Sequence, residues 1–284
     1  MIPATFEYIR AGSLAQALAL LGSHEDAKVI AGGHSLLPVM KFRMAQPGTL
    51  IDIARVPELH GIDRHQGDLR IGAATTYRAL LQSRLVSEGF PLLHECVEDI
   101  GDVQVRNRGT LGGSLAHCDP NSDLPAVMLV LGAKMVCVSA KGTRTVPAAQ
   151  FFTSAFSSAL QDGELLQEIH LPPLPAGAGT CYHTVAQAAS GYAMAGAAVV
   201  VTKAGGKVTS AKVALTSSGD IGRVVDTSAF VGSDGGDAAL AALGAAASAL
   251  TDATGDLHAP ADYRRHLMGV VTRRAAATAL SRAK

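Results

Sequence analysis

Two pairs of adjacent glycines constrain the folding of this sequence more than any other feature. The first pair lies in AGGHS (31–35), directly after the apolar residues Val29 and Ile30, and the second lies in RGTLGGS (108–114). Glycine lacks the Cβ atom that keeps a ligand away from the backbone, so the N–H groups of such segments can form an anion-binding nest. A single pair often forms only a turn, but two such segments indicate a ligand of the size of a dinucleotide.

Several classes of ligand site are disfavoured by the rest of the sequence. Neither glycine segment has the GxGxxG spacing before a helix or the GxxxxGK[ST] spacing, so a Rossmann or P-loop site is not supported. The 284 residues contain 24 Lys+Arg and 24 Asp+Glu, and only 4% are aromatic. This balance argues against the basic, aromatic surface that nucleic acids require. The four cysteines have no CxxC spacing, so we expect no metal site in this chain.

The first residues, MIPATFEYIRAGS, lack the basic and apolar regions of a signal peptide. No apolar run reaches the roughly 18–20 residues that a membrane span needs. Together with cysteines that form no pattern, these features lead us to expect a cytoplasmic protein without a transmembrane segment.

Short apolar segments separated by turn residues indicate helices and strands in alternation. Leucines and alanines at helical spacing predict a helix over 13–22 with Ser13 as its N-cap. Strands are expected in AKVI (27–30) and within 49–56, and Gly205-Gly206 predicts a hairpin turn. The stretch 101–125, which contains the second glycine pair, is predicted to be a loop.

Two polar residues near the glycine segments each allow two interpretations. Asp123 precedes an apolar helix that Pro125 would begin, so its carboxylate could cap that helix or accept hydrogen bonds from the hydroxyls of a polyol. The two roles can coexist. His34 could donate to a phosphate or stabilise its own loop.

Five segments of the sequence together resemble the FAD-binding medium subunit of molybdenum hydroxylases. This family includes the carbon monoxide dehydrogenase flavoprotein and the flavin domain of xanthine dehydrogenase. The two signature segments are AGGHSLLPVMKFRMAQPGTLIDI (31–53) and RNRGTLGGSLAHCDPNSDLP (106–125). Three further segments also match, in the same order along the chain: IGAATTY (71–77), ELLQEIHLP (164–172) and YRRHLMGVVTRRA (263–275).

The resemblance implies an α+β fold. Residues 1–175 would form a two-subdomain FAD-binding domain of the vanillyl-alcohol-oxidase (PCMH) type, divided near residues 57 and 58. A small α+β C-terminal domain would occupy residues 177–284.

The resemblance also implies which residues bind FAD. The first segment would wrap the pyrophosphate, the second would complete that cradle, and Asp123 would hold the ribityl side. Leu165 or Leu166 would cover the adenine or flavin edge, and Tyr192 would lie beside the isoalloxazine ring. The full set of expected cofactor-binding residues is Ala31, Gly32, Gly33, His34, Ser35, Leu36, Thr110, Gly112, Gly113, Ser114, Ala116, Asp123, Leu165, Leu166 and Tyr192. No catalytic residue and no metal ligand is expected on this chain.

The sequence departs from the family pattern near the expected flavin ring. Thr184, Gln187 and Gly191 stand where Lys, Arg and Asp are common. A cation near the N1–C2 edge stabilises the anionic reduced flavin, so we expect its loss to shift the redox potential.

The function implied is that of an electron-transfer subunit with non-covalent FAD. A large partner subunit would carry the molybdenum cofactor and a small one would carry two [2Fe–2S] clusters. The expected assembly is a dimer of heterotrimers. Two alternatives remain open from the residues alone: a stand-alone FAD-dependent oxidase or dehydrogenase, and an assembly subunit that has lost its flavin.

Overall fold

A computed structural model describes residues 1–284, and its first unit is a small parallel sheet with helices. Three strands pair in the order β1-β3-β2, and both pairings are parallel. The elements are β1 (Glu7–Arg10), α1 (Leu14–Ser23), β2 (Ala27–Ile30), α2 (Leu36–Lys41), β3 (Thr49–Asp52) and a 3-10 turn at Pro57–Leu59. The hydroxyl of Ser13 accepts from the N–H of Gln16, which confirms the predicted cap of α1.

The second unit is an antiparallel sheet of order β4-β5-β10-β6-β7, covered by helices. Its strands are β4 (Ile62–His65), β5 (Asp68–Gly72), β6 (Lys134–Ser139), β7 (Gly142–Pro147) and β10 (Leu165–Leu171), with a small hairpin of β8 (Phe152–Ser154) and β9 (Ser157–Ser158). Its helices are α3 (Tyr77–Gln82), α4 (Arg84–Gly89), α5 (Pro91–Asp99), α6 (Val103–Arg108), α7 (Leu111–His117), α8 (Leu124–Leu131) and α9 (Ala148–Phe151).

The prediction of a loop over 101–125 is wrong, because α6, α7 and the start of α8 lie within it. Asp102 and Thr110 explain the two additional helices. Each is an N-cap whose side chain accepts from a backbone N–H three residues later, at Val105 and Gly113 respectively. The glycine pair therefore lies in the first turn of α7, not in a loop.

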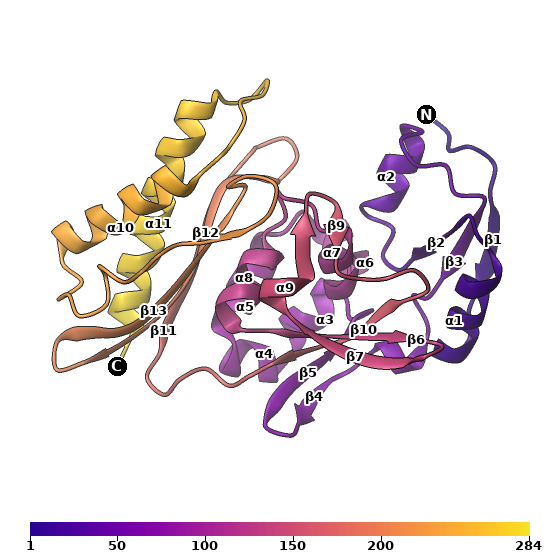
Figure 1. The fold of residues 1–284 in the computed structure, drawn as a ribbon, viewed down its shortest axis with the longest axis horizontal. Coiled ribbons are helices and arrows are strands. Elements are labelled where there is room, and N and C mark those ends of the chain that lie inside the picture. Colours follow the sequence, from indigo (N-terminus) through magenta and orange to yellow (C-terminus); the bar gives the residue numbers. More distant parts are fainter.

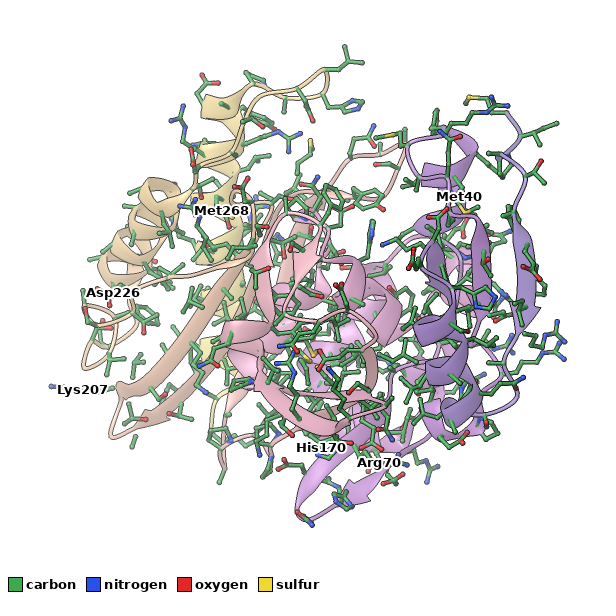
Figure 2. The ribbon with its side chains drawn as sticks, turned by 45° about the vertical axis from the view of Figure 1, so that its right-hand side comes forward. Met40, Arg70, His170, Lys207, Asp226 and Met268 are labelled. Carbon is green, nitrogen blue, oxygen red and sulfur yellow. The ribbon has the colours of Figure 1, made fainter.

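The C-terminal unit is a four-stranded antiparallel sheet of order β11-β12-β13-β14 with two long helices. Its elements are β11 (Gly179–Ala186), β12 (Ala193–Ala204), β13 (Lys207–Thr216), β14 (Arg223–Val224), α10 (Asp237–Leu250) and α11 (Ala261–Arg282). The predicted hairpin at Gly205-Gly206 is confirmed, and Figure 2 shows Lys207 at its outer end.

This sheet lies between two helical layers, with α11 on one face and α5 and α8 on the other (Figure 1). Side chains of β12 alternate between them: Ala198 and Val200 join the core of the second unit, whereas Ala197 and Val199 join the core beneath α11. A strand buried on both faces explains the nearly continuous apolar sequence AMAGAAVVV. The second and third units thus share one continuous hydrophobic junction.

Polar contacts also fasten this junction. Arg282, in the last turn of α11, donates to Glu95 Oε1 of α5 at 2.5 Å and to the carbonyl of Thr180 at 2.7 Å. The N–H of Lys284 donates to the carbonyl of Gly177 at 2.9 Å, so the end of the chain is attached to the connection between the units.

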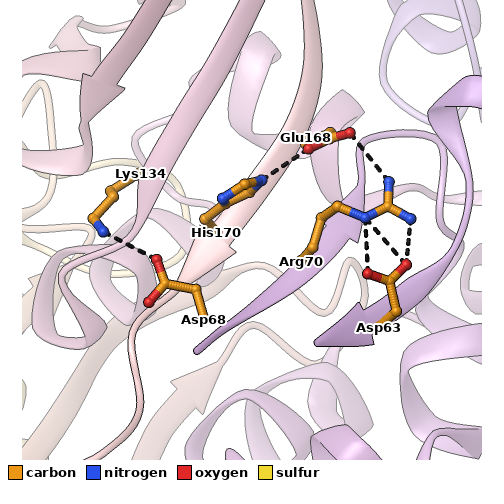
Figure 3. Close-up of polar contacts among 6 residues, drawn as sticks. All are labelled: Asp63, Asp68, Arg70, Lys134, Glu168 and His170. Carbon is orange, nitrogen blue, oxygen red and sulfur yellow. Dashed lines mark hydrogen bonds and ion pairs between the residues drawn. The ribbon is translucent and has the colours of Figure 1, made fainter. Parts of the chain in front are cut away.

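A row of ion pairs lies on the face of the second sheet opposite to its helix-covered core (Figure 3). Arg70 contacts Asp63 on β4 and Glu168 on β10, and Glu168 Oε2 lies 2.8 Å from His170 Nε2. In Figure 2 the labelled Arg70 and His170 lie far from Met40 of α2. These charges hold strands together at a distance from the glycine segments described next.

None of the helices combines the length and the apolar composition that crossing a lipid bilayer requires.

Candidate functional site

The first glycine segment presents a row of backbone donors without protein acceptors. None of the N–H groups from Ala31 to Leu36 donates a hydrogen bond within the chain. Gly33 has a φ of +76°, in the left-handed region that glycine adopts without strain. Successive N–H groups around such a residue form a concave nest for an anion. We call residues 31–36 the N–H cradle.

The two glycine segments meet in the structure, as the sequence predicts. A Cβ atom on Gly32 would lie 2.2 Å from the carbonyl oxygen of Arg108 and 2.9 Å from the Cα of Gly109. Backbone therefore packs directly on backbone at this point, and only glycine leaves room for the contact. The cradle is held in place by the turn that leads into α7.

The donors of the second segment are already occupied within the protein. Leu111 N–H donates to the carbonyl of Thr75, and Gly112 N–H donates to that of Ala73. Gly113 N–H donates to the side chain of Thr110. A Cβ on Gly112 would lie 2.4 Å from the Cβ of Ala73, so this glycine allows α7 to approach residues 73–75.

The second segment is therefore not the backbone nest that its glycines suggested. Its own donors stabilise the start of α7, and it supports the cradle through Arg108 and Gly109. Side-chain contacts of this segment with a ligand stay a prediction. Ser114, whose Oγ lies 2.8 Å from that of Ser122, and the half-buried Ala116 both belong to α7.

Asp123 is a nearly buried carboxylate, with 8% of its surface exposed. It stands at the N-cap position of α8, but its side chain forms no cap hydrogen bond, so the helix-capping interpretation is wrong. Instead the hydroxyl of Tyr182, on β11, donates to its Oδ1. Burial raises the pKa of Asp123 to about 6, while the bond from Tyr182 acts in the opposite direction.

Tyr192 lies in the connection between β11 and β12, and 45% of it is exposed. The pKa of its phenol is raised, first by partial burial and then by the charges of Asp119 and Asp123. The ring is thus placed near the segment that contains Asp123. In Figure 1 this connection and α2 both lie along the upper side of the molecule.

The residues that depart from the family pattern stabilise the same connection. Gln187 Oε1 accepts from the N–H of Ser190 at 2.7 Å, and Gly191 has a φ of +74°. Thr184 Oγ1 donates to the carbonyl of Ala195 at 3.3 Å. None of the three brings a charged group to this region, and the side chain of Gln187 also reaches His258, with its Nε2 3.4 Å from Nδ1 of that ring.

The remaining predicted residues have different surroundings. His34 Nδ1 lies 2.9 Å from the carbonyl of Gly32, so the ring stabilises its own loop. Leu165 and Leu166, both 5% exposed, fill two different cores, that of the first unit and that of the second. Their contact with a cofactor stays a prediction.

Sequence reasoning missed the contribution of the C-terminal unit to this region. Tyr182 reaches Asp123 from β11, and Ser217, after β13, donates to the side chain of Asn121 at 3.0 Å. The N–H of Ser217 donates to the carbonyl of Pro120 at 3.1 Å. The available signal was Tyr182 itself, one of only five tyrosines in the chain, on a strand with the sequence GTCYHTVA.

Two protein families match successive parts of this chain. Residues 4–174 match the family described as the FAD binding domain in molybdopterin dehydrogenase. Residues 180–279 match the CO dehydrogenase flavoprotein C-terminal domain. The chain belongs to the family of FAD-binding medium subunits of molybdenum hydroxylases, and it is an oxidoreductase subunit with FAD as its cofactor.

Individual relatives span the whole chain. The carbon monoxide dehydrogenase medium chain of Hydrogenophaga pseudoflava is 40% identical over 99% of both chains. Subunit alpha of the 6-hydroxypseudooxynicotine dehydrogenase complex of Paenarthrobacter nicotinovorans is 37% identical, over 100% of this chain and 97% of its own.

A solved structure gives the same result. A chain in the structure of carbon monoxide dehydrogenase from Hydrogenophaga pseudoflava that lacks the Mo-pyranopterin moiety superposes with a TM-score of 0.97, at 41% identity and with all of both chains covered. The predicted family and α+β fold class are confirmed.

Proposed function

We propose that this chain carries non-covalent FAD and transfers electrons within a heteromeric molybdenum hydroxylase. The observation that carries the proposal is the N–H cradle, in which six successive residues from Ala31 to Leu36 offer unpaired backbone donors. A diphosphate has many acceptor oxygens and two negative charges, so it needs such a set of donors. The cradle therefore fits the pyrophosphate of FAD.

Other residues would hold the rest of the cofactor. Asp123 would accept hydrogen bonds from the ribityl hydroxyls, and Tyr192 would lie beside the isoalloxazine ring. Thr110, Gly112, Gly113, Ser114 and Ala116 would border the cofactor from α7, with Leu165 or Leu166 at its edge. When bound, FAD supplies the redox chemistry, and the chain supplies binding, orientation and the electrostatic surroundings that set the potential.

The uncharged Thr184, Gln187 and Gly191 bear on that potential. They place no charged side chain where Lys, Arg and Asp were expected. Thr184 and Gln187 bond to backbone groups of Ala195 and Ser190, and Gln187 Nε2 also lies 3.4 Å from Nδ1 of His258. A reduced flavin that is anionic would receive less stabilisation from the protein. We therefore propose that this flavin has a lower potential than one with a cation in the Thr184 position.

The proposed partner subunits follow from the absence of an iron–sulfur ligand set among the cysteines of this chain. All four cysteines are buried and free, as core residues rather than as a ligand set. We propose that a small partner subunit carries two [2Fe–2S] clusters and a large one carries the molybdenum cofactor, in a dimer of heterotrimers. Electrons would pass from the clusters to the flavin and then to an external acceptor. Free thiols fit a cytoplasmic complex.

The test is purification of the tagged full chain from its own cells, followed by metal and flavin analysis. The proposal predicts co-purification of two partners together with molybdenum, iron and FAD, and flavin bleaching when substrate of the complex is added. A Gly32→Ala complex should keep molybdenum and iron but lose FAD and reduction of the acceptor. A yellow chain that purifies alone and oxidises a substrate by itself would instead support a stand-alone oxidase or dehydrogenase.

A further inference from the structure

The C-terminal domain reaches into the proposed flavin site through one buried side chain. Tyr182 is 5% exposed, and its hydroxyl donates to Oδ1 of Asp123 across the junction between the two domains. Thr216 Oγ1, on the neighbouring strand β13, lies 3.3 Å from the same hydroxyl oxygen and is 1% exposed. The phenol thus has two polar neighbours in an otherwise apolar layer.

The backbone leaves space for this arrangement. A Cβ atom on Gly196, which lies on β12 between the other two strands, would be 2.6 Å from the Tyr182 hydroxyl and 3.1 Å from the Cβ of Thr216. Any larger residue would displace the phenol. The single glycine of the strand sequence AMAGAAVVV, Gly196, therefore lies next to the Tyr182 hydroxyl, where a side chain would not fit.

The segment that contains Asp123 is also fixed from both sides. Ser122 contacts Ser114 of α7, and Ser217 of the C-terminal domain is hydrogen-bonded to Pro120 and Asn121. Residues 120–123 are therefore held between α7 and the C-terminal sheet. Tyr182 adds the one bond that reaches the carboxylate itself.

We propose that Tyr182 is a positioning residue of the flavin site, which keeps the Asp123 carboxylate oriented and ionised for the cofactor. This inference rests on the proposed function. A hydrogen bond from a fixed phenol defines which oxygen remains available to a ligand, and it favours the charged form of the acceptor. The C-terminal domain would thereby control FAD affinity without touching FAD through this residue.

Several other groups act on the same carboxylate. Asp99 at the end of α5 and Asp119 before the segment are both acidic, and each raises the pKa of Asp123. Tyr77, Cys96 and Tyr192 lie within range of its charge, and burial or that charge raises the pKa of each. The hydrogen bond from Tyr182 opposes this trend most strongly, and the backbone N–H of Asp123 itself adds to it. Removal of the Tyr182 hydroxyl should therefore make protonation of Asp123 easier.

The experiment measures FAD dissociation constants of the full chain by flavin fluorescence between about pH 5 and pH 8. In the wild type, affinity should fall as the pH drops through the range in which Asp123 gains its proton. Tyr182→Phe should move that fall to higher pH, and it should weaken binding about tenfold near pH 8, the size expected for a hydrogen bond to a charged group. Tyr263→Phe, an exposed tyrosine of α11, is the matched control and should bind as the wild type does.

A second variant keeps the test decisive if Tyr182→Phe folds poorly. Asp123→Asn retains an acceptor for the phenol but cannot ionise, so its FAD affinity should be weaker near pH 8 and nearly independent of pH. The inference is overturned if Tyr182→Phe shows the affinity and pH profile of the wild type, or if Asp123→Asn keeps the wild-type pH dependence. A wild-type chain that binds no FAD at any pH would overturn the proposed function as well.

Discussion

Gly32→Ala is the sharpest perturbation of the N–H cradle. The added Cβ would lie 2.2 Å from the carbonyl oxygen of Arg108 and 2.9 Å from the Cα of Gly109, and all of these atoms belong to backbone. Ordinary carbon–oxygen contact needs a separation larger by roughly 1 Å, so the cradle and the start of α7 must move apart. No flexible side chain is present to absorb the change.

The free-energy cost of Gly32→Ala can be estimated from substitutions that overpack a protein core. Forcing an extra methyl group into a closely packed contact costs about 1–3 kcal/mol. If 2–3 kcal/mol of this is lost from FAD binding, the dissociation constant rises by roughly 30- to 150-fold. The remainder would appear as a small loss of stability, because residues 31–33 are only partly buried.

The assay is an FAD titration followed by flavin fluorescence, together with thermal unfolding of the apo chain. Gly22→Ala is the matched control, since a Cβ there meets no atom within 4 Å and the residue lies in helix α1. The control should bind FAD normally and unfold at an equal or slightly higher temperature. If Gly32→Ala binds FAD within threefold of the control, the assignment of the cradle is refuted.

Thermal unfolding of three further variants tests the roles of Asp123, Arg70 and Phe151. The pKa of Asp123 is raised to about 6, so the folded chain binds this proton more tightly than the unfolded chain does. The wild type should therefore lose stability as the pH rises from about 4 to 6. Asp123→Asn should stabilise the apo chain near pH 8 by at most roughly 3 kcal/mol and should match the wild type near pH 4. If Asp123→Asn and the wild type were equally stable near pH 4 and also near pH 8, the raised pKa of Asp123 would be contradicted. Arg70→Met removes the pairs with Asp63 and Glu168 and should cost about 1 kcal/mol, less at high salt; a loss that salt does not change would argue against an ionic origin. Phe151→Ala should lower the free energy of unfolding by about 3–5 kcal/mol, because Phe151 is fully buried. A loss under about 1 kcal/mol would show that Phe151 is not packed in the core as described.

Local sequence signals predicted the local structure well. Ser13 caps α1 and Gly205-Gly206 forms the hairpin, because each depends on contacts within a few residues. The loop expected over 101–125 was wrong, because its glycines suggested a nest while Asp102 and Thr110 supplied caps for two short helices. Gly-Gly alone does not distinguish a ligand-binding turn from the tight start of a helix.

The site was predictable only in part, for a related reason. The free donors of residues 31–36 follow from the glycines and the preceding strand. In contrast, the donors of Leu111 and Gly112 are occupied by carbonyls of residues 73–75, a contact between distant parts of the chain that local pattern does not encode. The hydrogen bond from Tyr182 to Asp123 joins the C-terminal unit to the second unit, so local sequence pattern does not predict it either.

We propose that this chain binds FAD through the N–H cradle, and the most direct test is the flavin content of the purified full-length chain. We expect about one FAD per chain after reconstitution, released intact when the protein is denatured. This FAD should be lost in Gly32→Ala but not in Gly22→Ala. A folded wild-type chain that stays colourless in excess FAD, or one whose flavin is unaffected by Gly32→Ala, would contradict it.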